Sequence, residues 1–297
     1  MASEVMRTVE LKVLAVEQSE GQGSRVWRSI GSKELRRLDP FLLLDEFTSR
    51  PPHGFPDHPH RGFETVTYLT KGAMRHEDSK GHAGITRKGD LQWMTAGRGV
   101  VHSEMPVEGD ASGLQLWVNL KASEKMVEPD YQELLASQIP TVNTKGVEVK
   151  VIAGSCMDVI SPIRTRTPVY YLIFKMEPGS KFTQPLPMDW NAFIYILSGT
   201  IGVGDYDNLT ESGPHHTLVL NNGSAVDIIN PSAEKAHFVL VAGQPILEPV
   251  IQQGPFVMNT QEEILQAFQD YHQRQNGFEK YPISKPAAVG LCNLRRI

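Results

Sequence analysis

The sequence is poor in cysteine and lacks a long apolar run. Its 297 residues include only 2 cysteines, Cys156 and Cys292. Two thiols cannot build a disulfide framework, so we expect reduced cysteines and a compartment such as the cytosol or the nucleus. The N-terminal stretch "MASEVMRTVELKVLAVEQSEG" mixes acidic residues with apolar ones and so lacks the apolar core of a secretory signal. No apolar run is long enough to cross a bilayer, so we expect no membrane partner.

The chain also lacks an excess of positive charge. Its formal net charge is −5 and its pI is about 6.1. Non-specific binding to nucleic acid needs a cationic surface, so nucleic acid is not expected as a sole partner. We find no clear basic localisation cluster. Hydrophobic residues make up 40% of the chain, enough to bury a sizeable core in one large domain or two ordinary ones.

Short alternating apolar segments that end in turn residues dominate the sequence. Such segments are typical of half-buried β-strands followed by turns. Many short strands at regular spacing indicate a sandwich or a barrel, so we predict an all-β fold. The segments are "FETVTYLTKG", "GLQLWVNL", "VEVKVIAG", "VYYLIFKMEPG", "AFIYILSG", "HTLVLNNG" and "HFVLVAGQP".

Helical patterns are few. We expect one short helix near Ser123 to Ala136. A stronger pattern begins at Thr260, where Thr260 and Glu263 have the spacing of a capping box. Apolar residues then recur at helical spacing, and Gly277 is a suitable end for a C-terminal helix. The apolar residues in this pattern are Ile264, Leu265, Phe268 and Tyr271.

The sequence contains a faint internal repeat. "RGFETVTYLTKGAM" aligns with "DWNAFIYILSGTIG", and "RKGDLQWM" aligns with "NNGSAVDI", which matches Gly89 to Gly223. The repeat predicts two similar β domains, residues 1–143 and 144–297. In this alignment Pro185 and Pro187 stand in the places of His58 and His60, and Asn191 stands in the place of Glu64.

Two pairs of metal-ligand residue types lie in the first half. Residues two apart in a strand share a face, so His58 and His60 present two imidazoles together. Pro59 between them cannot donate a ladder hydrogen bond, which places the pair on an edge strand or at a strand start. His102 and Glu104 form a second pair with the same spacing. Two such pairs facing one barrel interior would supply three nitrogens and one carboxylate oxygen.

This donor set suits a six-coordinate first-row metal with two open positions. Iron is the first choice, ahead of manganese, nickel or copper, whereas structural zinc favours closed tetrahedral sites, often with thiolate. A single H-x-H also occurs in ordinary surface loops, so the second pair is what favours a site. Glu64 is a rival fourth ligand, because it lies four residues after His60. His237 lies one residue from the repeat counterpart of His102 but lacks partner ligands.

Long segments of the chain resemble the pirins, a family of the cupin superfamily. These segments are "LDPFLLLDEF", "GFPDHPHRGFETVTYL", "GDLQWMTAGRGVVHSEMP", "GLQLWVNL", "EKMVEPDYQEL" and "GPFVMNT". The resemblance implies a bicupin of two antiparallel, jelly-roll-like β-barrels with iron in the N-terminal one. The general cupin pattern has a ligand glutamate that matches Glu64 and a proline where Thr95 stands. In pirins the residues that match His58, His60, His102 and Glu104 hold the iron, so the resemblance favours Glu104 over Glu64.

The resemblance implies two kinds of function. Pirins resemble quercetin 2,3-dioxygenases, which open the flavonol ring with O₂ and release carbon monoxide; Glu104, or else Glu64, would be the catalytic base. The expected apolar pocket walls are Phe55, Phe63, Trp93 and Met94. Pirins are also described as iron proteins of the nucleus and cytoplasm that act as redox-dependent coregulators of NF-κB-type transcription factors. The alternative is a flavonol dioxygenase with no regulatory role.

A basic stretch offers a surface for such a partner. "QGSRVWRSIGSKELRR" carries five cations against Glu34 alone, and in an acidic protein such a patch can steer an acidic partner or a DNA-bound complex. The alternative is that these residues form an ordinary solvent-exposed face that binds no partner. We expect a monomer that does not itself recognise a DNA sequence. The five cations are Arg25, Arg28, Lys33, Arg36 and Arg37.

Overall fold

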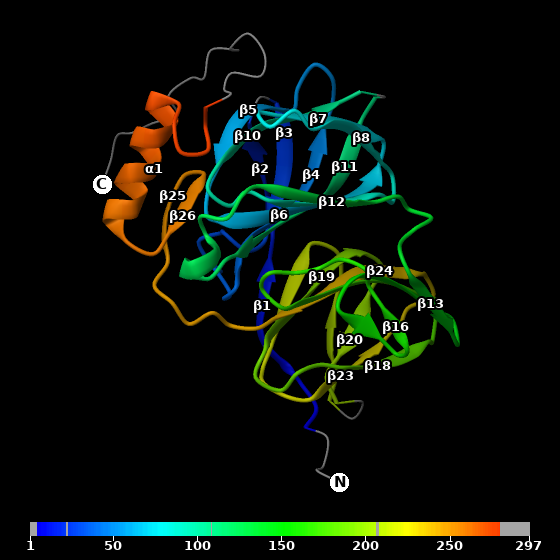
Figure 1. The fold of residues 1–297 in the computed structure, drawn as a ribbon. Helices are drawn as coiled ribbons and strands as arrows, with labels where there is room; N and C mark the ends of the chain where they lie inside the picture. Colours follow the sequence, from blue (N-terminus) through cyan, green and yellow to red (C-terminus); the bar gives the residue numbers. More distant parts are fainter. Residues whose placement is uncertain (1–4, 22, 108, 206–207, 280–297) are drawn as a thin grey trace.

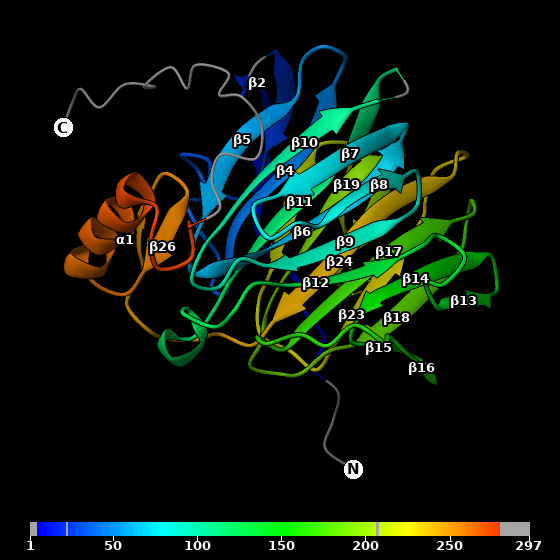
Figure 2. The same cartoon turned by 45° about the horizontal axis from the view of Figure 1, so that its top comes forward.

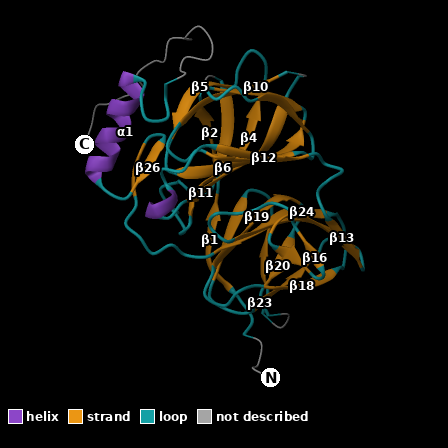
Figure 3. Ribbon diagram, viewed as in Figure 1, coloured by secondary structure: helices purple, strands orange, loops and turns teal. Residues whose placement is uncertain are grey.

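The computed structural model consists of two stacked β-barrels with one helix at the side of the first (Figure 1). It describes residues 5–21, 23–107, 109–205 and 208–279. Strands dominate the described residues, and the helix lies outside both barrels (Figure 3). The prediction of an all-β bicupin with a C-terminal helix is therefore confirmed.

The first barrel is formed by a 7-stranded and a 4-stranded antiparallel sheet. The large sheet has the order β12 (Asp130–Leu134), β9 (Leu91–Thr95), β6 (Phe63–Lys71), β11 (Ala111–Asn119), β4 (Phe41–Ser49), β3 (Ser24–Arg28) and β2 (Val16–Glu20). The small sheet has the order β5 (Phe55–His60), β10 (Val100–Pro106), β7 (Ala73–Asp78) and β8 (Ala83–Arg87).

The second barrel repeats this plan with a 7-stranded and a 4-stranded sheet. Its large sheet has the order β1 (Val9–Leu14), β22 (His216–Leu220), β19 (Asn191–Ser198), β24 (Ala236–Gly243), β17 (Val169–Met176), β14 (Val147–Ala153) and β13 (Thr141–Thr144). Its small sheet has the order β18 (Lys181–Pro185), β23 (Ala225–Ile229), β20 (Ile201–Val203) and β21 (Thr210–Ser212). Two ribbons complete the strands: β15 (Ser155–Cys156) with β16 (Val159–Ile160), and β25 (Ile251–Gln253) with β26 (Phe256–Met258).

The two large sheets pack against each other and form the core between the barrels. Along β6, Val66 and Tyr68 face this core, and Phe193 and Tyr195 face it from β19. The turned view shows β6 and β9 lying near β24 and β17 (Figure 2), and side chains of these strands share one buried cluster. Because both faces of β19 are covered, its sequence "NAFIYILS" is apolar almost throughout rather than alternating.

Segments near both ends of the described chain cross to the other barrel. β1 precedes every strand of the first barrel but pairs with β22 of the second. After the second barrel, β25, β26 and helix α1 (Gln261–Gln273) return to the first, where Val257 N–H donates to the Arg61 carbonyl at 3.0 Å. The division into residues 1–143 and 144–297 stays a prediction, and sequence reasoning did not foresee this exchange of ends.

The seven strand predictions are confirmed, and one of the two helix predictions is wrong. Each quoted segment contains a strand: β6, β11, β14, β17, β19, β22 and β24. Near Ser123 to Ala136 the structure instead has a 3₁₀ turn, Ala122–Glu124, followed by β12. β12 pairs with β9 at the edge of the sheet, so long-range pairing overrides the weak local helical preference.

Helix α1 begins as predicted and ends earlier. Thr260 is its N-cap, and both hydrogen bonds of the capping box with Glu263 are present. The helix ends at Gln273, where Arg274 takes the left-handed conformation with φ 56°. Gly277 lies three residues further on and does not end the helix.

Strand pairing corrects the second part of the internal repeat. β9 and β22 are equivalent, since Leu91 pairs with Tyr68 and Thr217 pairs with Tyr195. The match of Gly89 to Gly223 is therefore wrong, because Gly89 precedes β9 whereas Gly223 precedes β23, the equivalent of β10.

This register changes which residues replace the predicted ligands in the second barrel. Glu104 pairs with His76 on β7, and Ile228 pairs with Val203 on β20. Val226 and Ile228 therefore occupy the places of His102 and Glu104. The counterpart of His102 does not lie beside His237, where the sequence alignment placed it. Through its pairing with Val226, Gln184 takes the place of His58, and Leu186 follows in that of His60. The predicted replacements Pro185 and Pro187 are thus one residue out of register.

Candidate metal centre

Three histidines meet inside the first barrel. His102 on β10 lies directly opposite His58 on β5, and His60 lies two residues along β5. The ring centroids of His58 and His60 are 4.7 Å apart, those of His58 and His102 are 4.4 Å apart, and those of His60 and His102 are 5.0 Å apart. One ring nitrogen from each lies within 4.8 Å of the others. Within the described part of the chain, this is the one cluster of three or more His, Cys, Asp or Glu residues with that geometry.

The local sequence explains how β5 presents two imidazoles. β5 is an edge strand, so Pro59 sits where its missing N–H leaves no ladder bond unmade. The His58 Nδ1–H donates to the Pro56 carbonyl at 2.8 Å, which leaves Nε2 free to bind a metal. Gly62, with φ 90°, then turns the chain into β6; a Cβ there would lie 2.0 Å from the Val257 carbonyl oxygen.

The electrostatics favour the neutral form that binds metals. Burial holds the pKa values of His60 and His102 well below the ordinary histidine range. Burial also lowers the pKa of His58, while its hydrogen bond to Pro56 and the charges of Asp57 and Glu20 oppose that shift. His60 Nδ1 and both nitrogens of His102 are buried without a hydrogen-bond partner among the described residues. Unpartnered, neutral imidazole nitrogens that converge on one place fit a metal ion.

Glu104 lies beside this cluster on β10. Its Oε2 is 4.0 Å from His102 Nε2. The Thr67 hydroxyl lies 3.2 Å from Glu104 Oε1, and Gln115 Nε2 donates to Oε2 at 3.2 Å. Burial raises the pKa of Glu104, and its polar neighbours Thr67 and Gln115 oppose this rise. A metal bound here would replace these weak contacts as the main stabiliser of the carboxylate charge.

Glu64 points away from the histidines. Val66 and Tyr68 face the core between the barrels, and Glu64 shares their side of β6 because strand side chains alternate. Thr67, which contacts Glu104, faces the barrel interior. The spacing argument for Glu64 fails because the turn at Gly62 breaks the phase between β5 and β6. Burial raises the pKa of Glu64 to about 7, although the Thr95 hydroxyl donates to its Oε1 at 2.7 Å.

The predicted pocket walls divide between two faces. Phe63 lies by the histidines, with its ring 5.1 Å from that of His60, and Met94 pairs with Thr65 on the interior side. Trp93 instead belongs to the core between the barrels. Phe55 packs on Phe47, with ring centroids 5.9 Å apart.

Sequence reasoning missed an aromatic wall residue and two polar ones. The ring of Trp117 lies 5.2 Å from that of His60 and 4.4 Å from that of Phe63. Thr67 and Gln115, the two residues that contact Glu104, were also not singled out. The signal was present in "GLQLWVNL", where Gln115 and Trp117 share the face opposite to Leu114 and Leu116. A glutamine on a buried face is a sign of a polar barrel interior.

The basic patch is partly neutralised. Arg25 makes two hydrogen bonds of 2.6 Å to Glu17. Arg28 bonds Asp45 at 2.9 and 2.7 Å and Glu20 at 2.8 Å. The other three cations, Lys33, Arg36 and Arg37, are exposed.

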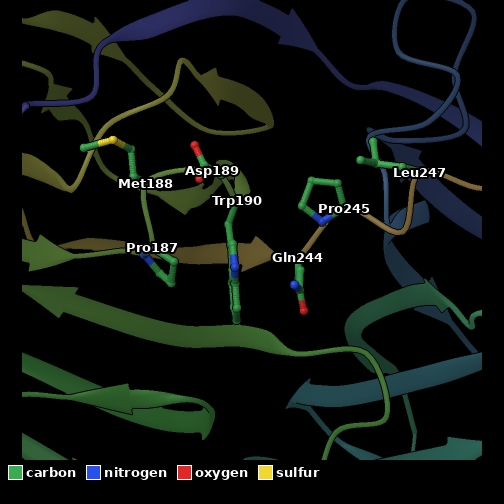
Figure 4. A pocket seen from close by; sticks show the side chains of 7 residues that line it. All are labelled: Pro187, Met188, Asp189, Trp190, Gln244, Pro245 and Leu247. Atoms are coloured by element: carbon green, nitrogen blue, oxygen red, sulfur yellow. The ribbon is translucent and has the colours of Figure 1, made fainter.

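A surface pocket lies on the second barrel (Figure 4), and none of its lining residues belongs to the histidine cluster. Trp190 is its aromatic residue and Asp189 its charged one, and the lining contains neither histidine nor cysteine. The histidine cluster of the first barrel is therefore not repeated in this pocket. Its lining residues are Pro187, Met188, Asp189, Trp190, Gln244, Pro245 and Leu247.

Among the described residues, no helix has the length and hydropathy needed to span a membrane.

Two antiparallel barrels in one chain, with a histidine cluster in the first, define a bicupin protein with a candidate metal site. The family described as "Pirin" matches residues 23–118, and "Pirin C-terminal cupin domain" matches residues 171–277. Pirin of Homo sapiens is 56% identical over 276 residues, which cover 92% of this chain and 95% of that protein. The chain belongs to the pirin family.

Solved structures agree with this assignment. A quercetin 2,3-dioxygenase from Acinetobacter baumannii is 32% identical with a TM-score of 0.83, and the match covers 91% of this chain and 98% of that one. A bacterial pirin, YhhW from Escherichia coli in complex with nickel(II), is 17% identical with a TM-score of 0.64, covering 79% of this chain and 99% of that one. At that identity the second likeness shows the shared fold alone.

Proposed function

We propose that the protein is a metal-dependent dioxygenase of the quercetin 2,3-dioxygenase type. The observation that carries this proposal is the meeting of three neutral, largely buried imidazoles beside one buried carboxylate. The likeness to a solved quercetin 2,3-dioxygenase supports it. The proposed ligands are His58, His60, His102 and Glu104.

Iron is the metal we propose for this site. Three imidazole nitrogens and one carboxylate oxygen suit a first-row divalent metal and leave positions open for other ligands. Iron can change oxidation state, which a reaction with O₂ and a redox response both use. Manganese, nickel and copper are the alternatives.

The protein residues have separate roles in this proposal. The bound metal would supply a Lewis acid and a redox centre for the reaction of a flavonol with O₂. Glu104 would accept the proton of the flavonol 3-hydroxyl. Phe63 and Trp117 would bind the flat aromatic rings beside His60.

Metal analysis of the native protein, together with aerobic turnover of quercetin, tests this function. We expect the iron-loaded protein to consume quercetin and O₂ in equal amounts and to release carbon monoxide. His102→Ala should lose both metal and turnover. Iron-loaded protein that consumes no O₂ with any flavonol would contradict the proposal.

We also propose a second role as a redox-dependent coregulator of an NF-κB-type transcription factor in the nucleus and cytoplasm. One contact supports a link between metal and surface: Arg28 of the basic patch pairs with Glu20, whose charge acts on His58. A change in metal charge would act on Glu20 and therefore on Arg28. A switch requires partner affinity to differ between the two oxidation states.

The test of this role should use the exposed cations rather than the paired ones. Lys33→Glu and Arg36→Glu should weaken binding to the partner, and the ferrous and ferric proteins should differ in affinity. Arg25→Glu is the comparison, because Glu17 already neutralises Arg25. Equal affinities across both oxidation states and all three variants would exclude this role and leave the dioxygenase alone. Imaging of the tagged protein in both compartments tests the proposed location.

A further inference from the structure

We propose that Thr67 and Gln115 are positioning residues that orient the Glu104 carboxylate and set the preference of the site between ferrous and ferric iron. This inference rests on the proposed function, because it takes Glu104 as a ligand of the metal. Neither residue is in the predicted ligand set. Both act through Glu104 and not through direct contact with the metal.

The sheet register brings the two residues together. Thr67 on β6 lies directly opposite Gln115 on β11, and both point into the barrel. Glu104 reaches them from β10 in the other sheet. Each carboxylate oxygen of Glu104 then has one polar neighbour, Thr67 at Oε1 and Gln115 at Oε2, both at 3.2 Å. Glu104 and Thr67 are only 4% and 3% exposed, so bulk water does not compete strongly for these contacts.

The number of available protons determines which groups donate and which accept in these hydrogen bonds. The Thr67 hydroxyl carries one proton and also lies 3.0 Å from Gln115 Oε1. An ionised carboxylate repels a carbonyl oxygen, so the Gln115 amide must turn its Nε2–H₂ toward Glu104. Its Oε1 then faces Thr67 and needs the hydroxyl proton. Thr67 therefore holds Gln115 in the orientation that donates to Glu104.

The second barrel offers an internal comparison. In register, Ile194 and Leu240 pair with each other as Thr67 and Gln115 do. Both are fully buried in an apolar cluster. The polar pair thus occurs in the barrel that has the histidines, and an aliphatic pair replaces it where Ile228 stands in the place of Glu104. This is the pattern expected if the pair serves the carboxylate rather than the fold.

The pair should affect the two oxidation states of iron differently. A hydrogen bond to a ligand carboxylate withdraws electron density that the carboxylate would otherwise donate to the metal. A carboxylate that donates less electron density stabilises ferrous relative to ferric iron. Loss of the hydrogen bond to the carboxylate should therefore lower iron affinity because Glu104 is misoriented. It should separately shift the balance toward the ferric form.

The experiment measures Fe²⁺ affinity under anaerobic conditions and the reduction potential of the bound iron in Gln115→Met and Thr67→Val. We expect Fe²⁺ affinity to fall about 10-fold and the ratio of ferric to ferrous affinity to rise about 10-fold. Thr67→Ser keeps the hydroxyl and should retain the wild-type ratio. A purely structural role would weaken both oxidation states equally and leave the potential unchanged.

Matched controls come from the same sheet face. Gln92 lies opposite Thr67 on its other side but donates to Glu133, so Gln92→Met should leave the ratio unchanged. Thr65→Val removes a neighbouring buried hydroxyl that faces the same interior. A ratio that stays at the wild-type value in both Gln115→Met and Thr67→Val, or that moves as far in Gln92→Met, would overturn the inference.

Glu104→Gln separates this inference from the function on which it rests. If Glu104→Gln binds iron as the wild type does, the proposed ligand set is wrong and the inference fails with it. If Glu104→Gln weakens iron binding while Gln115→Met and Thr67→Val do not change the ratio, only the inference fails. Thermal unfolding of each metal-free variant checks that the fold is retained.

Discussion

The two barrels share a strand plan but differ in what fills them. The second barrel contains one continuous apolar cluster that includes Ile194, Val226, Ile228 and Leu240. The first barrel has several smaller apolar clusters, and polar side chains lie between them. The difference shows that the outer faces of the strands determine the shared fold, whereas the interior is free to be either a core or a site.

The two interiors also differ in their energetic cost. Burying an imidazole or a carboxylate without a partner is unfavourable, and His102 has no hydrogen-bond partner among the described residues. A barrel interior built only for stability would be apolar, as the second one is. The first barrel therefore carries a local instability that metal binding can offset.

The largest expected effect comes from giving the first barrel the interior of the second. His102→Val combined with Glu104→Ile introduces the residues that Val226 and Ile228 provide in the other barrel. We expect Fe²⁺ or Ni²⁺ affinity to fall at least about 1,000-fold, because two of four ligands are lost. The metal-free protein should unfold at the same or a higher denaturant concentration. Metal binding that survives the double change, measured by equilibrium dialysis, would show that the site lies elsewhere.

The next effect concerns helix α1, which packs against the first barrel. In the part of the chain that the structure describes, no α-helix packs against the second barrel. Arg61, directly after His60, forms a 2.8 Å ion pair with Asp270 of α1, and both side chains are 1% exposed. Asp270→Ala would leave a buried guanidinium that keeps its bonds to the Arg98 and Asn276 carbonyls but loses its carboxylate partner, and should cost about 3–5 kcal/mol in denaturant unfolding. Glu262→Ala, at an exposed position of the same helix, should cost far less. Similar midpoints for the two variants would show that α1 does not stabilise the first barrel.

A third prediction concerns Glu64→Gln, which replaces a carboxyl group with an amide. The second barrel also has an amide at this place, since Asn191 matches Glu64. A raised pKa means that folded Glu64 holds a proton up to about pH 7, whereas the unfolded chain releases it near 4.5. The stability of the metal-free protein should therefore fall as pH rises through this window, by about 3 kcal/mol. Glu64→Gln should remove this loss and be the more stable protein above pH 7.

The same variant tests the choice between two carboxylates. Since Glu64 faces away from the histidines, Glu64→Gln should bind metal as the wild type does. Denaturant unfolding at several pH values and dialysis against Fe²⁺ give the two readouts. A pH profile unchanged by the substitution would mean that Glu64 titrates normally, and a loss of metal would return Glu64 to the ligand set.

Local patterns were enough to predict most of the strands and the start of α1. Alternation marked β6 and β14, and the capping box at Thr260 needs only residues within one turn. The shared face within each ligand pair was also accessible, because the H-x-H and H-x-E spacings match the period of a strand. These features depend on neighbours in sequence, which the sequence shows directly.

Most of the failures depend on long-range pairing. β12 is a strand because β9 lies beside it, and β1 crosses to β22 of the other barrel. The spacing from His60 to Glu64 is misleading because the turn at Gly62 reverses the face. In the repeat, Gly89 and Gly223 precede similar strands, and only their partners show which strands are equivalent. No local pattern identifies a strand partner that lies far away in the sequence.

The smallest effect is expected from completing the apolar interior of the second barrel. Gln184 stands in the place of His58, is 2% exposed, and has a buried Oε1 without a hydrogen-bond partner among the described residues. Its Nε2 donates to the Pro185 carbonyl at 2.8 Å. Gln184→Leu loses that bond but removes the desolvated oxygen, so we expect a gain of about 1 kcal/mol in denaturant unfolding. His58→Leu, the matched change in the first barrel, should lower metal affinity, whereas Gln184→Leu should leave metal affinity unchanged. Destabilisation by Gln184→Leu would mean that this glutamine supports the second barrel and is not a polar remnant in an otherwise apolar interior.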